Sequence, residues 1–268
     1  MLTPTKIKTL LTENGPFYAL GLLIALGLKY YYTRATADDL GWILIPTSRL
    51  VELLTGIPFE KESLLGLVNH SVRFIIAPAC AGINFLTIAF STFFFSFLSR
   101  LRGTRVKILW VGLSMGLAYL LTLGANALRI IASIHLYGAD FYAGWITMER
   151  VHRIGGTLIY FISLLFAYLA MVRITETCVS GRSAEKGGIL QRTSPLRKAG
   201  SCLVPFFWYV IIGLGIPLLN MAYRKDGAKF TEHFSFVISA CLSTLLFVFL
   251  LLFGYQKLAR RMRRPKRK

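Results

Sequence analysis

Apolar runs of membrane-spanning length recur along this chain of 268 residues and constrain its fold more than any other feature. A helix needs about 20 mostly apolar residues to cross a hydrocarbon layer of about 30 Å. Only 16% of the residues are charged, and the runs recur towards the C-terminal end, which argues against a soluble chain with one signal peptide. The first run lacks a small-residue cleavage site, so we expect it to be retained. The sequence therefore predicts an all-α polytopic membrane protein.

We expect about six transmembrane helices, and an additional interfacial or re-entrant segment between the first and the second. That segment, Leu40–Pro58, contains Arg49 and Glu52 and is split by Pro46, which favours an amphipathic helix at the interface over a full span. Residues 64–76 are expected to be extended and to pack on the outer face. The six expected spans are residues 17–32, 83–98, 108–128, 155–172, 203–222 and 234–254.

Basic residues are distributed unevenly between the two sides of the membrane that six spans would create. The segments on the side of the N-terminus carry 20 basic and 3 acidic residues, and the remaining segments carry 11 basic and 9 acidic residues. By the positive-inside rule the basic side is cytoplasmic. We therefore expect a multi-pass inner-membrane protein of the cell with both termini in the cytoplasm. The first group comprises residues 1–16, 99–107, 173–202 and 255–268, and the second comprises residues 29–82, 129–154 and 223–234.

The formal net charge of +19 suits either nucleic acid or anionic lipid. No folded nucleic-acid reader accompanies the basic C-terminal residues, so nucleic acid is not an expected partner. The tail 255–268 is expected to anchor the topology and to contact anionic lipid headgroups of the membrane. The chain then divides into a membrane domain of residues 1–175, a cytoplasmic basic linker of residues 176–202, two C-terminal transmembrane helices in residues 203–254, and the basic tail.

Three reactive side chains fall on the outer side of this topology. Cys80 directly precedes the second span, Arg129 ends the third, and His152 lies in a loop that enters the fourth. A cysteine attacks as its thiolate, and a histidine can take the thiol proton and return one to a leaving amine. An arginine offers several donors to a developing oxyanion. These three residues are the candidate catalytic set.

Each of these residues also has a purely structural interpretation, which stays open. A cysteine near a helix start often only packs, an arginine at a helix end often reaches to headgroups, and a loop histidine is often only solvated. Asn126 lies three residues before Arg129 and shares its helix face, so it either orients Arg129 or a substrate carbonyl, or it packs between helices. Gly82 and Gly155 are expected to permit close backbone approach.

Three short motifs follow one another across residues 80–160: CAGINF before a span, NALRI at a span end, and a histidine followed by Gly-Gly and an aromatic-rich span. In this order and spacing the chain resembles the exosortase/archaeosortase family of membrane cysteine transpeptidases, and the CAGINF form resembles the exosortase K subgroup. The resemblance covers roughly residues 17–175 and leaves the basic linker and the two C-terminal spans unmatched.

The resemblance implies a reaction and a role for each residue. Members of this family are thought to cut a C-terminal sorting signal of exported proteins, which combines a short motif, a transmembrane helix and a basic cluster. Cys80 would form a thioester with the new carboxyl end, Arg129 resembles the catalytic arginine, and His152 resembles the general acid/base. Motif position ranks His135 second and His70 third as the base, and His135 is also a candidate for orienting the substrate. No cofactor and no metal are expected.

Two other function classes deserve comparison with this one. A non-enzymatic transporter or assembly factor for surface polymers fits the number of spans, but such proteins carry ionisable groups inside their spans. The charge count above, which assigns Lys29 to the outer segment 29–82, already accounts for all 31 basic and 12 acidic residues and leaves none for the spans. A metal-dependent membrane protease needs a motif such as HExxH on a span, and the four histidines are far apart in this sequence. The enzymatic interpretation therefore remains the leading hypothesis, with the transporter as the alternative.

Overall fold

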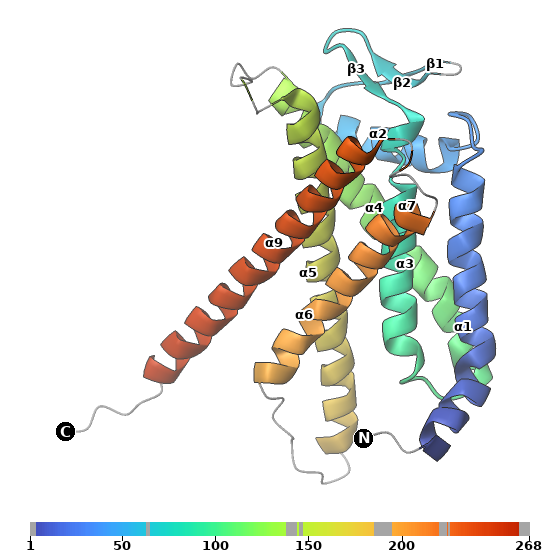
Figure 1. Ribbon diagram of the computed structural model, residues 1–268, viewed down its shortest axis with the longest axis vertical. Coiled ribbons are helices and arrows are strands. Elements are labelled where there is room, and N and C mark those ends of the chain that lie inside the picture. The colour runs from blue at the N-terminus through green and yellow to red at the C-terminus, as the bar shows by residue number, and fades with distance from the viewer. Residues whose placement is uncertain are drawn as a thin grey trace.

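The computed structural model describes residues 4–62, 65–137, 144, 147–184, 195–219, 224 and 226–262. Figure 1 shows a bundle of long helices with a small sheet at one end, which we call the sheet end. Helix α1 begins, and helix α9 ends, towards the opposite end of the bundle. The elements are α1 (Pro4–Tyr32), α2 (Gly41–Thr55), β1 (Glu60–Glu62), β2 (Gly66–Asn69), β3 (Phe74–Ile76), the 3₁₀ turn η1 (Pro78–Cys80), α3 (Ile83–Leu98), α4 (Thr104–Tyr137), α5 (Met148–Ala184), α6 (Pro195–Val210), the π-helical turn η2 (Ile211–Gly215), α7 (Ile216–Leu219) and α9 (Gly227–Met262).

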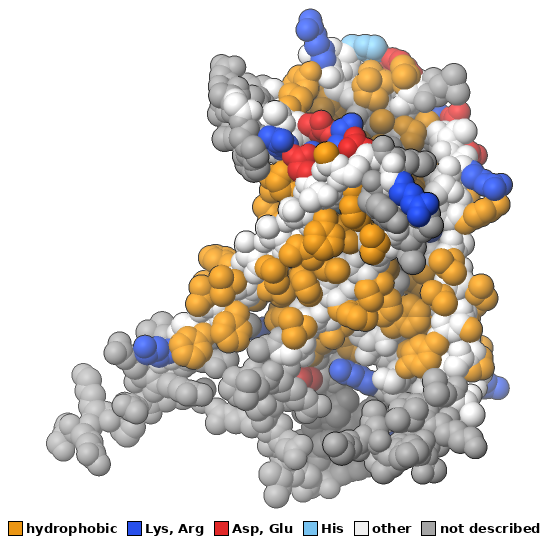
Figure 2. All heavy atoms as spheres, viewed as in Figure 1, with side chains coloured by type: hydrophobic (Ala, Val, Ile, Leu, Met, Phe, Trp, Pro, Cys, Tyr) orange, Lys and Arg blue, Asp and Glu red, His pale blue; other side chains and the backbone are white. Residues whose placement is uncertain are grey.

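Five helical segments of the described chain are long and apolar enough to cross a membrane, which confirms a polytopic helical membrane protein. Hydrophobic side chains cover the middle of the surface in Figure 2, and the charged side chains in view lie towards its two ends. The five segments coincide with the second to sixth expected spans. They are Pro78–Leu98, Thr104–Tyr137, Met148–Thr177, Gly200–Leu218 and Gly227–Leu251.

Helix α1 contains the first expected span but is not among these five segments. Its apolar run is short, because Pro16 precedes it and Lys29 and three tyrosines follow it. Helix α1 nevertheless packs closely on α3: a Cβ atom at Gly21 would lie 2.3 Å from the ring of Phe94, so only glycine permits this approach. Its opposite face exposes several leucines, namely Leu20, Leu22, Leu23 and Leu26.

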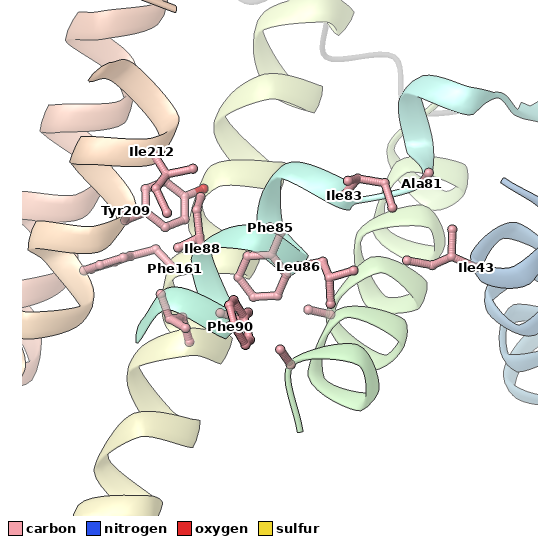
Figure 3. Close-up of a cluster of buried hydrophobic side chains, with 14 of the residues drawn as sticks. Ile43, Ala81, Ile83, Phe85, Leu86, Ile88, Phe90, Phe161, Tyr209 and Ile212 are labelled. Atoms are coloured by element: carbon pink, nitrogen blue, oxygen red, sulfur yellow. The ribbon is translucent and has the colours of Figure 1, made fainter. Parts of the chain in front are cut away.

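Helix α3 forms the centre of the bundle. Its span is 83% buried inside the protein, whereas each of the other four spans is 28% buried or less. Large apolar side chains of α3 fill the space between α1, α4, α5 and α6, and Figure 3 shows Phe85, Ile88 and Phe90 packed towards Phe161 and Tyr209 of the neighbouring helices. A helix that is apolar all round is buried on all sides, which is what the phenylalanine-rich sequence of α3 requires.

Helix α2 lies across the sheet end of the bundle and is continuous, so the expected break at Pro46 does not occur. A proline inside a helix removes one hydrogen bond, and the rest of this helix stays anchored by packing on α4. The hydroxyl of Tyr119 donates to the carbonyl of Trp42 at 2.8 Å, and the two rings stack. With 15 residues, α2 is shorter than a helix that crosses the hydrocarbon layer.

The three strands form an antiparallel sheet in the order β1-β2-β3 at the sheet end (Figure 1). The expectation of an extended stretch in residues 64–76 is thus confirmed for residues 66–69 and 74–76. The register pairs Val68 of β2 with Glu60 on one side and with Ile75 on the other. Strand β3 continues directly into η1 and α3, so the sheet fixes the position at which the central helix begins.

The helices extend into two regions that the sequence assigned to a linker and a tail. Helix α5 continues to Ala184 and α6 begins at Pro195, so the expected linker 176–202 contributes to both. Residues 185–194 of that linker lie outside the described residues. Helix α9 continues to Met262, and residues 263–268 of the basic tail lie outside the described residues as well.

Candidate active site

A cavity of about 400 Å³ opens at the sheet end between β3, η1, α4 and α5. We call it the site cavity. Its walls include Cys80, Arg129 and His152, the three residues that the sequence singled out. It also contacts Ser133, one turn beyond Arg129 on α4, and Glu149, at the start of α5. Three side chains separated by more than 70 positions in the sequence therefore meet at one end of the bundle.

The thiol of Cys80 is presented by a turn between the sheet and the central helix. Cys80 ends the 3₁₀ turn η1, Gly82 follows in the left-handed region with φ of 72°, and α3 begins at Ile83. A Cβ atom at Gly82 would lie 3.1 Å from Thr122 and 3.3 Å from the hydroxyl of Tyr160, so both the backbone angle and the space favour glycine. The expected close approach at Gly82 is confirmed, and it places the thiol near the N-terminus of α3.

Arg129 and His152 form a hydrogen-bonded pair on the wall of the site cavity. The Nη2 of Arg129 lies 2.8 Å from the Nε2 of His152, and the Oγ of Ser133 lies 2.8 Å from the Nδ1 of His152. Because a guanidinium only donates, Nε2 is the acceptor and the ring proton is on Nδ1, directed at Ser133. The hydroxyl of Ser133 then donates to the carbonyl of Arg129 at 2.8 Å. With this tautomer of His152, the hydrogen bonds from Arg129 to His152, from His152 to Ser133 and from Ser133 to the carbonyl of Arg129 can all form together.

A second set of hydrogen bonds joins Arg129 to the backbone that carries the thiol. The hydroxyl of Tyr160 accepts from Nη1 of Arg129 at 3.2 Å and donates to Oδ1 of Asn126 at 2.8 Å. The Nδ2 of Asn126 donates to the carbonyl oxygen of Cys80. The ring of Tyr160 stacks on Phe85 of α3, with centroids 4.4 Å apart. This network fixes Arg129 relative to η1, and it gives Asn126 a contact with Cys80 itself.

Gly156, rather than the expected Gly155, permits the close approach of α4 and α5. A Cβ atom at Gly156 would lie 2.6 Å from the Nε of Arg129, whereas one at Gly155 would have no atom within 4 Å. The two glycines differ because neighbouring helical positions point about 100° apart and only Gly156 faces α4. The Nε of Arg129 is buried and has no hydrogen-bond partner among the described residues.

Two helices are longer at the sheet end than the apolar runs suggested. Arg129 does not end its helix, because α4 continues for two more turns to Tyr137 through residues that contain no proline or glycine. His152 does not lie in a loop, because α5 begins at Met148 with Glu149 in its first turn, where a carboxylate suits the helix dipole. Both residues therefore project from rigid helices, which holds their side chains more firmly than a loop would.

The other two candidate histidines lie away from the site cavity. His135 is exposed, and its Nδ1 lies 2.9 Å from the carbonyl of Ile131 on its own helix. The side chain of His70 is 75% exposed and its Nε2 lies 2.7 Å from a carboxylate oxygen of Glu62 on the sheet. Neither residue lines the site cavity, so the geometry leaves His152 as the histidine beside Arg129.

Sequence reasoning did not single out Ser133 and Tyr160, which hold the pair in place. Ser133 lies four residues after Arg129, so helical spacing alone places it on the same face. Tyr160 lies eight residues after His152, again on the same side of a helix. Both signals were present in the spacing, but only the packing of α4 against α5 shows which helical neighbours meet.

Ion pairs attach the C-terminal helix to the site. Glu232 of α9 accepts from Arg150 at 2.6 Å and from Arg153 at 3.0 Å, and both arginines belong to the first turns of α5. On the other side of Arg129, a second cavity of about 240 Å³ is lined by Arg153, His233 and Tyr209 as well as by Arg129. Helix α9 therefore closes one wall of the region around the site.

Metal-ligating side chains occur across the described part of the chain. Among the described residues, no three His, Cys, Asp or Glu side chains converge closely enough to hold a metal ion. The polar side chains that line the site cavity carry a thiol, two guanidinium groups, an imidazole, two hydroxyls and a carboxylate. This set suits acyl transfer through a cysteine nucleophile.

Comparisons of the chain with protein-family models, with curated proteins and with solved structures gave no match. The chemistry of the site cavity is therefore the basis for assigning a function.

Proposed function

We propose that this protein is a membrane-embedded cysteine transpeptidase or protease that cleaves a C-terminal sorting signal of exported proteins through a thioester intermediate. The observation that carries the proposal is the site cavity, which is lined by Cys80 and by the hydrogen-bonded pair of Arg129 and His152. The substrates would be exported proteins with a short motif, a transmembrane helix and a basic cluster at their C-terminal end. The proposed relationship is to the exosortase/archaeosortase family.

The proposed reaction has two balanced steps. In the first, the thiol of Cys80 transfers its proton to a base, its sulfur bonds to the acyl carbon, and the peptide C–N bond breaks as the amine leaves with a proton. In the second, the nitrogen of an acceptor amine or the oxygen of water bonds to the acyl carbon, the C–S bond breaks, and the proton that the acceptor loses returns to the sulfur to restore the thiol. A thioester intermediate divides a difficult cleavage into two easier steps.

His152 and Arg129 have complementary roles in this proposal. The Nε2 of His152 carries no proton, so it can accept the proton of the thiol once Arg129 withdraws from it. The guanidinium of Arg129 would then turn its donors to the acyl oxygen, where charge develops. Asn126 and Tyr160 act as positioning residues, because they connect Arg129 to the carbonyl of Cys80. His135 remains a candidate only for contacts with substrate outside the cavity.

The proposed topology has six spans, with α1 as the first, and places the site on the outer, periplasmic side of the cell membrane. Two helices support a membrane boundary at the site. Lys107 and Arg129 are separated on α4 by about 33 Å of helical rise, and Arg153 and Arg173 on α5 by about 30 Å, with no charge between them. These lengths match the hydrocarbon layer of about 30 Å. The basic excess at the opposite end favours cytoplasmic termini and contact with anionic lipid there.

Helix α2 is proposed to lie in the interface of the outer leaflet. It buries Ile43, Leu44 and Val51 against the bundle and exposes Leu53 and Leu54. An amphipathic helix with apolar residues on its outer side suits the boundary between headgroups and acyl chains.

One observation favours a second candidate function, a polytopic transporter or assembly factor for surface polymers. The cavity behind Arg129 contains Arg153 and His233 between helices, and ionisable groups inside a helical bundle often mark the path of a polar substrate. Transport would depend on these side chains and would not require the thiol of Cys80. Only the transpeptidase or protease function requires the sulfur of Cys80, so replacing this thiol distinguishes the two functions.

Replacing the thiol tests the proposed function. Cells that express the protein, Cys80→Ala or Cys80→Ser would be compared by mass spectrometry of the C-terminal peptides of exported single-span proteins. We expect both variants to insert normally and to lose the shortened C-termini, while Cys202→Ala, a buried cysteine outside the site, keeps them. Shortened C-termini that persist in Cys80→Ala would refute the cysteine mechanism and favour the second candidate.

A further inference from the structure

The two edges of the sheet differ in the way they are protected. The strand order leaves β1 and β3 as the edges. Strand β1 reads Glu-Lys-Glu, and charges of this kind normally prevent another strand from pairing with an edge. Strand β3 reads Phe-Ile-Ile, carries no charge, and exposes 45% of Ile75. Among the described strands, β1 is therefore protected from pairing by its charges, and β3 has an edge that another strand could pair with.

The open edge borders the site cavity. Arg73, Phe74 and Ile75 all line this cavity. Phe74 and Ile75 belong to β3, and successive side chains of a strand point to opposite faces, so a cavity that touches both of them meets the strand at its edge and not at one face. From β3 the chain continues through Ala77 into η1, which ends at Cys80. In Figure 1, β3 is the strand of the sheet nearest to the start of α5.

Backbone N–H and C=O groups of β3 are available for pairing with another strand. Alternate residues of an antiparallel strand direct their N–H and C=O groups to opposite sides, so at least one residue of β3 directs these groups away from β2. In the described part of the chain, no strand pairs with that side of β3. Arg73, which precedes β3, has φ of 49°, in the left-handed region that residues other than glycine rarely adopt. The turn thus holds a charged side chain at the rim of the cavity.

We propose that the polypeptide substrate binds as a fourth strand on the edge of β3, and that this pairing carries the scissile bond to Cys80. The inference rests on the proposed function, because it takes the substrate to be a polypeptide. Strand addition obtains affinity from main-chain hydrogen bonds and specificity from the pockets of alternate side chains. The cavity of about 400 Å³ lies within the usual range of ligand pockets. An extended peptide is the form in which a carbonyl is most accessible to a thiolate.

A pair of peptide electrophiles tests the inference without a known substrate. The first probe is a trialanyl chloromethyl ketone, and the second is the same molecule with every backbone amide N-methylated, so that it cannot donate to a strand. Small chloroacetamide serves as a probe of thiol reactivity alone. The full-length protein in membrane vesicles is incubated with each probe, and labelling of Cys80 is followed by peptide mapping.

Proline variants at the two edges provide the matched comparison. Ile75 and Lys61 are the central residues of β3 and β1. Ile75 pairs with Val68 and Lys61 pairs with Leu67, and these two consecutive residues of β2 direct their backbone N–H and C=O groups to opposite sides. The backbone N–H groups of Ile75 and Lys61 therefore have the same orientation relative to β2. Ile75→Pro and Lys61→Pro therefore disturb the sheet equally, but only Ile75→Pro changes the strand that borders the site cavity. Chloroacetamide labelling of Cys80 in each variant shows whether the site is intact.

The expected result is that the plain peptide labels Cys80 about tenfold faster than its N-methylated analogue, which corresponds to about 1.4 kcal/mol of main-chain pairing. This preference disappears in Ile75→Pro and persists in Lys61→Pro. Equal labelling of the wild-type protein by the two peptides would overturn strand addition and leave the cysteine mechanism standing. Failure of all three probes to label Cys80 would refute the proposed function, and the inference with it.

Discussion

The Nη2 of Arg129 lies 2.8 Å from the Nε2 of His152, so a permanent cation donates to the nitrogen that would have to accept the proton of a thiol. The imidazole is therefore held neutral, with its proton on Nδ1 towards Ser133. In this resting arrangement, Nη2 of Arg129 and Nε2 of His152 are hydrogen-bonded to each other. We expect the acyl group of a substrate to draw Arg129 away and to release Nε2. Substitutions of the residues that contact this pair therefore test its role.

The first prediction concerns the tautomer of His152. Ser133→Ala removes the acceptor for Nδ1, and we expect a decrease in processing of about fivefold, since one neutral hydrogen bond contributes about 1 kcal/mol. The measurement is the rate at which exported single-span proteins acquire shortened C-termini in cells. Ser114→Ala, on the same helix, is the control, because the hydroxyl of Ser114 is buried and has no partner among the described residues. Equal rates for the two variants would show that Ser133 does not orient the imidazole.

The second prediction concerns the guanidinium itself. Arg129→Lys keeps the charge but cannot donate to His152 and Tyr160 simultaneously, and a lysine has no planar fork to present to an oxyanion. We expect processing to decrease about 100-fold or more, which is the usual effect of losing an oxyanion donor.

The matched control for Arg129→Lys is Arg150→Lys. Arg150 also lies at the sheet end and pairs with Glu232, and a change in such a partly exposed ion pair typically costs less than about 1 kcal/mol. We expect its processing rate to stay within about twofold of wild type. If Arg129→Lys processes substrates at the wild-type rate, the paired donors of the Arg129 guanidinium are not needed for the reaction.

The third prediction concerns the hydroxyl that bridges Arg129 and Asn126. Tyr160→Phe keeps the stacking on Phe85 and leaves two polar atoms without a partner, Nη1 of Arg129 and Oδ1 of Asn126. Unpaired polar atoms in a buried site cost about 1–3 kcal/mol. We expect a lower midpoint of thermal unfolding in detergent and a slower reaction of Cys80 with chloroacetamide. If both remain at their wild-type values, the hydroxyl bridge is dispensable.

The fourth prediction uses two adjacent glycines on α5. Gly156→Ala places a methyl group 2.6 Å from the original position of the Arg129 Nε, so the guanidinium must move and processing should decrease about tenfold or more. Gly155→Ala meets no atom within 4 Å and improves helix propensity by about 1 kcal/mol, so it should stabilise the protein or leave it unchanged. Similar activity in the two alanine variants would mean that α4 and α5 do not hold Arg129 as closely as described.

The class of the protein and the region of the site could be read from the sequence. Apolar runs of spanning length, separated by charged segments, predict membrane helices because the hydrocarbon layer accepts little else. The order of Cys80, Arg129 and His152 relative to those runs was enough to place all three at one end of the bundle. Helix limits were less predictable: Pro46 did not break α2, and α4 continued past Arg129, because packing and local helix propensity outweigh a single residue.

What tertiary structure decided is which of the residues at that end touch. Hydropathy and charge act along the chain and set the depth of each residue in the membrane, so they assign His70, His135 and His152 to the same side without ranking their distance from Arg129. The rotation and closeness of α4 and α5 make that choice. They depend on where glycine lets two helices meet, as at Gly156, and on hydrogen bonds between helices, as at Tyr160. Membrane depth follows from composition, whereas contact across helices follows only from packing.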